Sequence, residues 1–288
     1  MTSGLFSHTI TKTHYQCVRK RLYENVMQPH VNLTQFAQST PLFTLGELRE
    51  RYGKKTRSRS ILNMLHRLKQ QGRVRQLTKG VYGGALAAVP LNRYRVPSTL
   101  RNDATLALHS ALEWHGVANQ VFQTVYYFSA RARKDVIFEN VTYHRAAPPV
   151  ALVRARKVRL QTQETSEGFL VTNRERSFVD CLLFLDYSGG VEELDESLAM
   201  FPSFDFEAAL EYLKLLRKPW LYSRLGFLLD RHADKLFFRD AARRQFLRRL
   251  PPGVAYLGDK RRGNRWVPTW RLMVPETLAP SAESRIQT

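Results

Sequence analysis

Cysteine is nearly missing from this sequence. Its 288 residues include only two, Cys17 and Cys181, and neither has a C-x-x-C partner. A disulfide framework and a cysteine-rich zinc site are therefore excluded, and we expect each cysteine to be a small buried apolar residue. No run approaches the roughly 20 apolar residues of a membrane span, and the N-terminus lacks the pattern of a signal peptide. We expect no membrane association and a cytoplasmic location.

Recognisable catalytic motifs are also missing. The sequence has no P-loop, no G-x-S-x-G and no H-E-x-x-H spacing. His109 and His115 stand six residues apart, which places them on different faces of a helix, so we expect core or surface histidines. The acidic run Glu192–Glu196 is typical of a solvated helix face rather than of a metal cage. We expect no enzyme active site, no metal and no cofactor.

Acidic residues are scarce, above all in the first third of the chain. The 45 Lys and Arg oppose 25 Asp and Glu, which gives a formal net charge of +20 and a pI near 10.3. Residues 1–90 contain 15 Lys and Arg but only three acidic residues, so they carry 12 of the 20 excess charges. This balance is typical of proteins that bind a polyanion. A merely soluble basic surface is the alternative interpretation.

The order of local patterns in this third predicts a winged helix-turn-helix. Helical residues are expected over 18–38. Thr44-Leu-Gly-Glu47 matches a capping box, in which both side chains satisfy free amides at a helix start. A second helix should span about 57–71, and two strand-like runs then flank the turn Thr78-Lys79-Gly80, as in a hairpin.

The second helix of this motif has two contrasting faces. At 100° per residue, one side carries the apolar residues Ile61, Leu62, Leu65 and Leu68, which we expect to pack against the preceding helix. The opposite side has no acidic residue and presents Thr56, Arg59, Ser60, Asn63, Arg67 and Gln70. Arg, Asn and Gln read base edges in the major groove, and hydroxyls near a helix start contact phosphate. A solvated face usually mixes Glu with Lys, so the pattern favours DNA reading.

Cations that flank this helix are predicted phosphate contacts, which position a protein on DNA without specifying the sequence. Lys54, Lys55 and Arg57 precede the helix or lie in its first turn. The predicted wing adds Arg73, Arg75 and Lys79. Whether Arg73 or Arg75 faces the DNA depends on the hairpin register, which the sequence does not determine.

The rest of the chain predicts a larger domain of mixed strands followed by a helical bundle, so the expected fold class is α+β. The expected elements are a helix over 103–115, a hairpin of 123–130 with 136–145, strands at 152–160 and 169–171, a capping box at Thr172–Glu175, a helix capped by Asp205 and a helix over 220–238. The expected domains are a flexible leader (1–17), the winged helix (18–88), a linker (89–102), the α+β domain (103–274) and a flexible tail (275–288).

A second basic concentration lies near the C-terminus. It comprises Arg243, Arg244, Arg248, Arg249, Arg261, Arg262 and Arg265, with Trp266 and Trp270 beside it. Cations with aromatic residues bind nucleic acid by stacking, or they bind an acidic protein partner. A solvated helix followed by a strand anchored by tryptophan is the slightly favoured alternative.

Three runs of residues carry a resemblance to a known family. They are Phe43-Thr-Leu-Gly-Glu47 followed by Ile61-Leu-x-x-Leu65-x-x-Leu68-x-x-x-Gly72-x-Val74-x-x-Leu77-x-Lys79-Gly80-x-Tyr82; His109-Ser110-Ala111-Leu112-x-x-His115-Gly116; and Val171-Thr172-x-x-Glu175-Arg176-Ser177-x-x-Asp180. Together these runs resemble the AbiEi-type antitoxins. The resemblance covers about residues 40–230. Each motif is weak alone, and their order and spacing give the resemblance its specificity. Ser177 stands where the family pattern has Thr.

The resemblance implies an antitoxin and autorepressor of a bacterial toxin–antitoxin system of the AbiE kind. It implies a winged helix that binds double-stranded DNA at inverted repeats of its own promoter, and a C-terminal domain that counters a nucleotidyltransferase-like toxin. By position, the DNA contacts fall on Arg57, Arg59, Ser60, Asn63, Arg67, Arg73, Arg75 and Lys79. Other classes stay open: a protein-interaction module, an RNA-binding protein, or an enzyme that processes nucleic acid.

Overall fold

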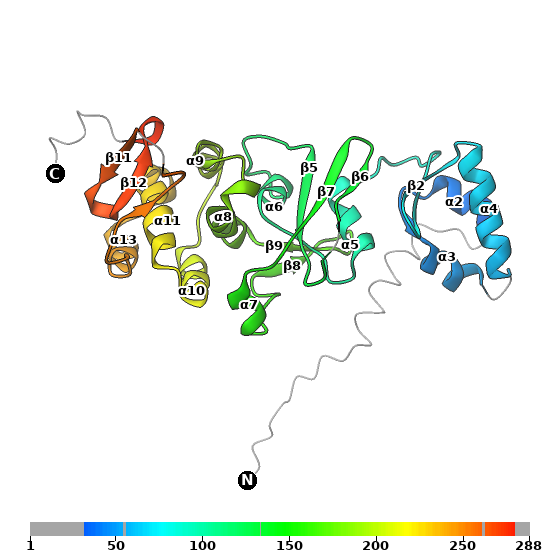
Figure 1. Cartoon of the computed structure of the whole chain (residues 1–288), viewed down its shortest axis with the longest axis horizontal. Coiled ribbons are helices and arrows are strands. Elements are labelled where there is room, and N and C mark those ends of the chain that lie inside the picture. The colour runs from blue at the N-terminus through cyan, green and yellow to red at the C-terminus, as the bar shows by residue number, and fades with distance from the viewer. Residues whose placement is uncertain (1–31, 54–55, 133, 261–262, 280–288) are drawn as a thin grey trace, which may run out of the picture. The chain divides into compact units, whose positions relative to one another are not determined.

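The computed structural model of the chain describes residues 32–53, 56–132, 134–260 and 263–279. It forms two compact units, the N-terminal unit (Met1–Leu91) and the C-terminal unit (Asn92–Thr288). The boundary between them falls within the expected linker 89–102. Both units combine helices and strands (Figure 1), so the predicted α+β class is confirmed. Every helix in the described ranges is too short or too polar to cross a lipid bilayer.

The N-terminal unit has the element order that the sequence predicted. Its described elements are α2 (Leu33–Ser39), β1 (Phe43–Thr44), α3 (Leu45–Tyr52), α4 (Ser58–Gln70), β2 (Val74–Thr78) and β3 (Val81–Gly84). The three strands form an antiparallel sheet in the order β1-β3-β2. Helix α2 corresponds to the end of the helix expected over 18–38, and residues 18–31 lie outside the described residues, as does the leader 1–17.

Local chemistry explains where the N-terminal helices begin. The capping box of α3 is confirmed: the Thr44 hydroxyl accepts from the Glu47 amide at 3.1 Å, and the Glu47 carboxylate accepts from the Thr44 amide at 2.7 Å. The Asn32 side chain caps α2 by accepting from the Gln35 amide at 2.8 Å. These bonds satisfy amides that the first turn of a helix leaves without partners.

An apolar core holds α4 against the rest of this unit. Ile61, Leu65 and Leu68 are buried as expected, but Leu62 is 41% exposed and Met64 takes the fourth core position at 8%. The buried spacing is thus i, i+3, i+4 and i+7, which is the spacing of one helix face, whereas Leu62 lies 100° away from Ile61. The core also includes Phe36, Phe43, Leu48, Val74 and Tyr82.

The hairpin lies close to the end of α2. The Gly84 amide donates to the Thr40 carbonyl at 2.9 Å. A Cβ atom at Gly84 would lie 2.2 Å from the Gln38 carbonyl oxygen, so only glycine fits this approach. The hairpin turn is also attached to α3, because the Leu45 amide donates to the Gly80 carbonyl at 2.8 Å. The strands and the three helices therefore share one small core.

The C-terminal unit contains a six-stranded mixed sheet, a set of helices and a small three-stranded sheet. Its strands are β4 (Thr105–Leu106), β5 (Thr124–Phe128), β6 (Val136–Phe138), β7 (Val141–Ala146), β8 (Thr162–Glu164), β9 (Leu170–Thr172), β10 (Ala255–Tyr256), β11 (Asn264–Val267) and β12 (Leu272–Pro275). The large sheet has the order β6-β7-β5-β4-β9-β8, and the small one has the order β10-β12-β11. Strand β9 confirms the strand expected at 169–171.

Helices cover and extend the large sheet. The α-helices are α5 (Val96–Leu100), α6 (His109–Trp114), α7 (Val150–Arg154), α8 (Arg174–Leu183), α9 (Val191–Ala199), α10 (Phe206–Leu216), α11 (Pro219–Arg231), α12 (Ala233–Leu236) and α13 (Asp240–Leu247), and short 3-10 turns span 93–95, 185–187, 268–270 and 276–278. Figure 1 shows α6 and α8 beside the large sheet, with α11 and α13 towards the small sheet. The order of strands followed by a helical bundle agrees with the expectation.

Several expected elements of this unit differ from the structure. Strand β5 pairs with β7 in parallel, and the hairpin is β6 with β7, so 123–130 and 136–145 do not form the expected hairpin. The helix expected over 103–115 is only α6, because Thr105 and Leu106 form β4. Residues 152–160 contain the end of α7 and turns instead of a strand. The helix expected over 220–238 is divided into α11 and α12.

The expected capping box at Thr172–Glu175 does not form. Asn173 caps α8 by accepting from the Arg176 amide at 2.9 Å, while Thr172 is buried at the end of β9 and its hydroxyl bonds the Ser177 hydroxyl. The Glu175 carboxylate accepts from the Asp205 amide instead. Asp205 does cap α10, as expected, by accepting from the Ala208 amide at 2.9 Å.

Trp270, in the 3-10 turn 268–270, anchors the small sheet to the helical bundle. Trp270 is 1% exposed, and its ring lies where a Cβ atom of Gly226 on α11 would be, 2.1 Å from the nearest ring carbon. Its indole N–H donates to the Asp230 carboxylate at 2.9 Å. Glycine at position 226 therefore makes room for the ring, and Asp230 satisfies its only polar atom.

Candidate nucleic-acid interface

The outward face of α4 is exposed along its whole length. Arg59, Ser60, Asn63, Arg67 and Gln70 all lie on the surface, opposite the buried face. Arg57 is also exposed and stands at the N-cap position without a side-chain cap bond. Thr56 precedes the helix and is half-buried, with its amide donating to the Tyr52 carbonyl at 2.9 Å. The predicted reading residues therefore share one surface, and Thr56 lies at its N-terminal end.

His66 also lies on this face, although the sequence reasoning did not select it. Its Nε2 is 3.0 Å from the Gln70 side-chain amide nitrogen, one helical turn away. The spacing could have identified His66, because it follows Asn63 by three residues and precedes Gln70 by four. The exposed Leu62 borders the same face. Together they add an aromatic ring and an apolar side chain to a surface of Arg, Asn and Gln.

The strand register determines where the cations of the β2–β3 hairpin point. On β2, Val74 and Leu77 are buried, and Arg75, opposite Gly83 on β3, is exposed. Arg73, just before the strand, and Lys79, in the hairpin turn, are exposed as well. Both arginines are therefore on the surface, so the register does not select one of them over the other. The alternation of the strand is interrupted further along, by a register shift between Gln76 and Thr78.

A hydrogen bond connects the β2–β3 hairpin to α4. The Lys69 ammonium donates to the Gln76 side-chain oxygen at 2.8 Å. Lys69 belongs to the last turn of α4, and Gln76 lies in the middle of β2. This bond adds to the core contacts that hold the helix and the hairpin in one arrangement. The cations of both elements are thus carried by one packed unit.

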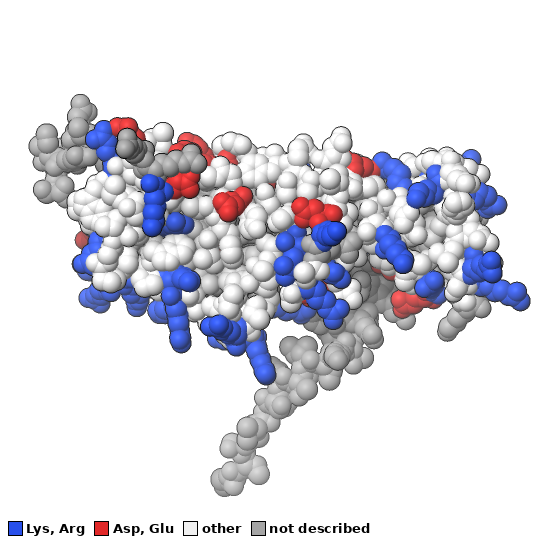
Figure 2. Space-filling view, in the orientation of Figure 1, with Lys and Arg blue, Asp and Glu red and all other residues white. Residues whose placement is uncertain are grey.

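The stretch of chain that carries this surface has charged residues of one sign. No Asp or Glu occurs anywhere between Glu50 and Asp103 in the sequence. In Figure 2, the unit that carries α4 shows Lys and Arg side chains over several parts of its visible surface and few acidic ones. A surface of this kind attracts phosphate and repels acidic surfaces. Lys54 and Lys55, which were predicted to add to it, lie outside the described residues.

Several arginines of the second basic concentration form hydrogen bonds or ion pairs within the C-terminal unit. Arg243 forms two hydrogen bonds to Asp230, at 2.9 and 3.1 Å, and lies over the Trp270 ring. Arg265 pairs with Glu276. Of the remaining arginines, Arg244 and Arg248 are exposed, Arg249 is half-buried, and Arg261 and Arg262 lie outside the described residues.

The two tryptophans of this region, like its arginines, differ in exposure. Trp270 is buried, so it is not free to stack on a base, whereas Trp266 on β11 is 43% exposed. This part of the chain agrees best with the interpretation of a helix followed by a strand anchored by tryptophan.

The acidic run 192–196 is only partly solvated, which corrects the sequence prediction. Glu193 is 4% exposed and Asp195 is 5% exposed. Glu193 accepts from the Gln120 amide and the Ser197 hydroxyl, and its carboxylate lies 2.9 Å from His109. Asp195 pairs with Arg231 and His232, both at 2.9 Å. These carboxylates hold the fold together.

His109 is the centre of a buried charged network. Its Nδ1 lies 2.9 Å from Glu113 and its Nε2 lies 2.9 Å from Glu193, and its ring stacks on Phe122. Burial favours a higher pKa for Glu193, but hydrogen bonds led by that from His109 lower the pKa overall. His115 bonds the Thr172 carbonyl, and burial lowers its pKa. Both histidines are therefore structural.

No group of three or more His, Cys, Asp or Glu within the described ranges has a geometry that could hold a metal ion. Cys181 is fully buried on α8, as predicted, and burial raises the pKa of its thiol well above the usual value. Such a thiol is a poor nucleophile. Cys17 lies outside the described residues.

Comparison with known proteins gives one family match and one likeness of fold. A crystal structure of the Rv2827c protein from Mycobacterium tuberculosis is similar to 84% of this chain and 89% of that chain, with a TM-score of 0.56 and 17% identity, which is a likeness of fold. Curated proteins give no significant match. Residues 33–83 match the family model described as the transcriptional regulator, AbiEi antitoxin. The resemblance seen in the sequence is thereby confirmed for residues 33–83, from α2 to β3, which are similar to this family.

Proposed function

We propose that this chain is a DNA-binding transcriptional repressor whose N-terminal unit is a winged helix-turn-helix, with a DNA-binding domain over 18–88. The observation that carries the proposal is the outward face of α4, which is exposed, free of acidic residues and held in place by a buried face on the same helix. The N-terminal unit has α3, α4 and the β2–β3 hairpin in the order that is typical of a winged helix. In such domains the second helix of the motif enters the major groove.

Sequence choice comes from the middle of α4. Arg59 and Arg67 are suited to the guanine edge, and Asn63 is suited to adenine. All three are exposed on the same face. Each correct bidentate contact contributes about 1–3 kcal/mol of discrimination against a wrong base pair.

Affinity comes mainly from phosphate contacts. Arg57 at the start of α4, Ser60 in its first turn and Arg73, Arg75 and Lys79 on the wing fulfil this role, and Lys54 and Lys55 precede them in the sequence. Neutralised phosphates release counterions, so the binding is expected to weaken steeply with salt. Repression then follows from occupancy of the operator, which excludes other proteins from the same DNA.

The family match extends the proposal to a toxin–antitoxin system. The AbiEi description names both a transcriptional regulator and an antitoxin. We assign repression of its own promoter, at inverted repeats, to the N-terminal unit. Neutralisation of a nucleotidyltransferase-like toxin is assigned to the C-terminal unit, and both activities belong to the cytoplasm. The two roles predict that an N-terminal variant with lost DNA binding still protects cells that express the toxin.

A gel-shift competition tests the DNA proposal. Full-length protein is titrated onto a labelled duplex from its own upstream region, with unlabelled random duplex, single-stranded DNA and hairpin RNA as competitors, at several salt concentrations. We expect the upstream duplex to compete best and the logarithm of affinity to fall linearly with the logarithm of salt. Stronger competition by RNA would instead support an RNA-binding protein, and absence of binding at low salt would support a protein-interaction module.

A further inference from the structure

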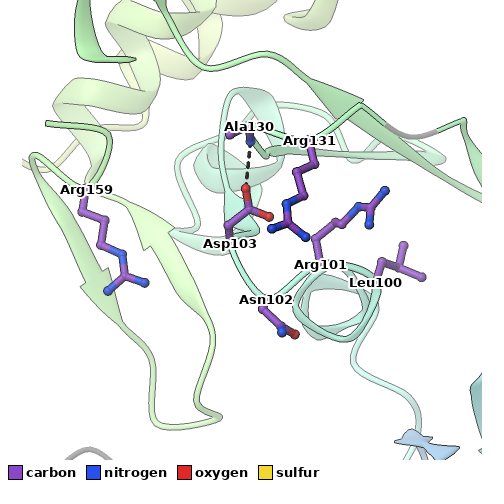
Figure 3. Close-up of a pocket in the computed structure, with 7 residues that line it drawn as sticks. All are labelled: Leu100, Arg101, Asn102, Asp103, Ala130, Arg131 and Arg159. Atoms are coloured by element: carbon purple, nitrogen blue, oxygen red, sulfur yellow. Dashed lines mark hydrogen bonds between the residues drawn. The ribbon is translucent and has the colours of Figure 1, made fainter. Parts of the chain in front are cut away.

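A pocket in the C-terminal unit is built mainly from cationic and amide side chains. It has a volume of about 590 Å³ and lies between the segment after α5, the segment after β5 and the segment between α7 and β8. Figure 3 shows Arg159 across the pocket from Arg101 and Arg131, with Asn102 and Asp103 between them. We propose that this pocket binds a phosphorylated small molecule of about the size of a nucleotide.

The single acidic residue of the pocket is already occupied. One oxygen of Asp103 accepts from the Ser129 hydroxyl and the other accepts from the Ala130 amide, both at 2.9 Å. These bonds fold the turn after β5 onto the segment after α5. Asp103 thus braces the pocket wall and has reduced capacity to neutralise the arginines.

The arginines, by contrast, keep unused donors. Arg101 donates from Nη2 to the Ala132 carbonyl at 3.0 Å, and its Nε is buried without a hydrogen-bond partner. The side chains of Arg131 and Arg159 have no ion-pair or hydrogen-bond partner among the described residues, and both are exposed to solvent. A guanidinium group binds phosphate oxygens through two parallel hydrogen bonds. Two such groups from different segments can hold one phosphate from two sides.

The surrounding chain strengthens the positive field. No Asp or Glu occurs between Glu139 and Glu164, and Arg156 and Lys157 lie exposed just before Arg159. Fields from like charges at the edge of a concave site add inside it and favour an anion there. The phosphate is therefore assigned to the space between Arg131 and Arg159.

Size and lining point to an organic phosphate rather than to a bare ion or a duplex. Pockets of about 300–1,000 Å³ are typical of small-molecule sites, and this volume falls within that range. The Asn102 amide can donate to and accept from hydroxyls or a base edge, and Leu100 supplies an apolar wall. The phosphates of a duplex lie on a convex surface, which enters a concave pocket poorly.

Calorimetric titration of the full chain tests the proposal. The probes are a nucleoside monophosphate, the matching nucleoside and inorganic phosphate, applied to the wild type and to Arg131→Gln, Arg159→Gln and Arg154→Gln. The last variant removes an equal charge from the segment before Arg159 without touching the pocket lining. Thermal unfolding of each variant confirms that it is folded.

We expect the nucleoside monophosphate to bind, the nucleoside to bind at least tenfold more weakly, and Arg131→Gln and Arg159→Gln each to reduce affinity about tenfold or more. Arg154→Gln should leave the affinity unchanged. Arg159→Lys, which keeps the charge but loses the paired donors, should restore only part of it.

Absence of binding by the monophosphate, equal binding of the nucleoside, or an equal loss in Arg154→Gln would overturn the proposal. So would displacement of the nucleotide by random duplex DNA, which would make the pocket part of a nucleic-acid surface. This inference is independent of the proposed DNA binding by α4. If the DNA proposal fails and the pocket proposal holds, the wild-type protein will bind the nucleotide but not the duplex.

Discussion

The two units use their charged residues in opposite ways. In the described part of the chain, every buried polar or charged residue belongs to the C-terminal unit, including His109, Arg176, Asp180 and Glu193. The core of the N-terminal unit is apolar and aromatic, and the cations of α4 and the wing are on its surface. The cations of the N-terminal unit that are named here are exposed to solvent, whereas many charged side chains of the C-terminal unit form internal hydrogen bonds and ion pairs that stabilise its fold.

The difference shows why a count of basic residues does not locate a binding surface. Arg176 is fully buried beside Asp180 and donates to the Val158 and Leu160 carbonyls. Arg224 donates to the Tyr256 and Leu182 carbonyls, and burial lowers its pKa to about 10. Burying a cation without partners is costly, and both side chains are held by hydrogen bonds inside the unit. Only cations that remain exposed, as on α4, are offered to a ligand.

The largest expected effect is loss of stability in the C-terminal unit when its buried network is broken. We expect His109→Leu to lower the free energy of unfolding by about 3–5 kcal/mol, because Glu113 and Glu193 then remain buried without the group between them. Urea denaturation followed by tryptophan fluorescence measures this unit alone, since all four tryptophans lie within it.

His144 provides the matched control for that variant. It pairs with Asp135 on the surface, where the two side chains are 30% and 45% exposed. His144→Leu should therefore change the free energy of unfolding by about 1 kcal/mol or less. Similar losses in both variants would show that the buried network contributes no more than an ordinary surface pair.

The next effect concerns the core that holds α4. We expect Leu65→Ala to destabilise the N-terminal unit by about 2–5 kcal/mol, because Leu65 is only 2% exposed. Leu62→Ala should stay within about 0.5 kcal/mol, since Leu62 is 41% exposed. Hydrogen exchange of the α4 and β3 amides reports this unit. A greater loss in Leu62→Ala would contradict the placement of the buried face.

A pH effect should appear in the C-terminal unit below neutral pH. The pKa of Glu193 is lowered in the folded protein, so its contribution is present above the unfolded value and is lost as the pH falls through the lowered pKa. Glu193→Gln should flatten this part of the stability profile. Urea titrations at a series of acidic pH values measure it, and an unchanged profile in the variant would remove Glu193 from the network.

The smallest expected effect is on salt dependence. Lys79→Ala should weaken binding to all duplex sequences alike and reduce the slope of log affinity against log salt by about one unit. Lys260→Ala, which changes a lysine of the C-terminal unit that lies over the Tyr256 ring, serves as the control and should keep the wild-type slope. An unchanged slope in Lys79→Ala would mean that the hairpin turn does not contact phosphate.

The N-terminal unit was the more predictable one because its signals are local. The Thr44 capping box, the Gly80 turn and the spacing of apolar residues on α4 all lie within a few residues of one another. The sequence analysis assigned Leu62 to the core instead of Met64. Both residues flank the buried face of α4, and only the residues that pack against the helix decide which of them is buried. His66 was overlooked although its spacing placed it on the outward face of α4.

The C-terminal unit was harder to predict because its contacts join distant residues. Glu193 looked like part of a solvated run, since its partner His109 stands 84 residues earlier. The parallel pairs β5–β7 and β4–β9 likewise join segments that local alternation cannot match. The phosphate pocket depends on Arg159 meeting residues almost 60 positions away, and no local pattern indicates such a site.

The outward face of α4 is tested most directly by Arg59→Ala, titrated onto the upstream duplex and onto random duplex under one salt condition. A base-reading arginine predicts a loss of about 1–3 kcal/mol on the upstream site and little change on random DNA. Equal losses on both duplexes would contradict the account, because Arg59 would then contribute only charge.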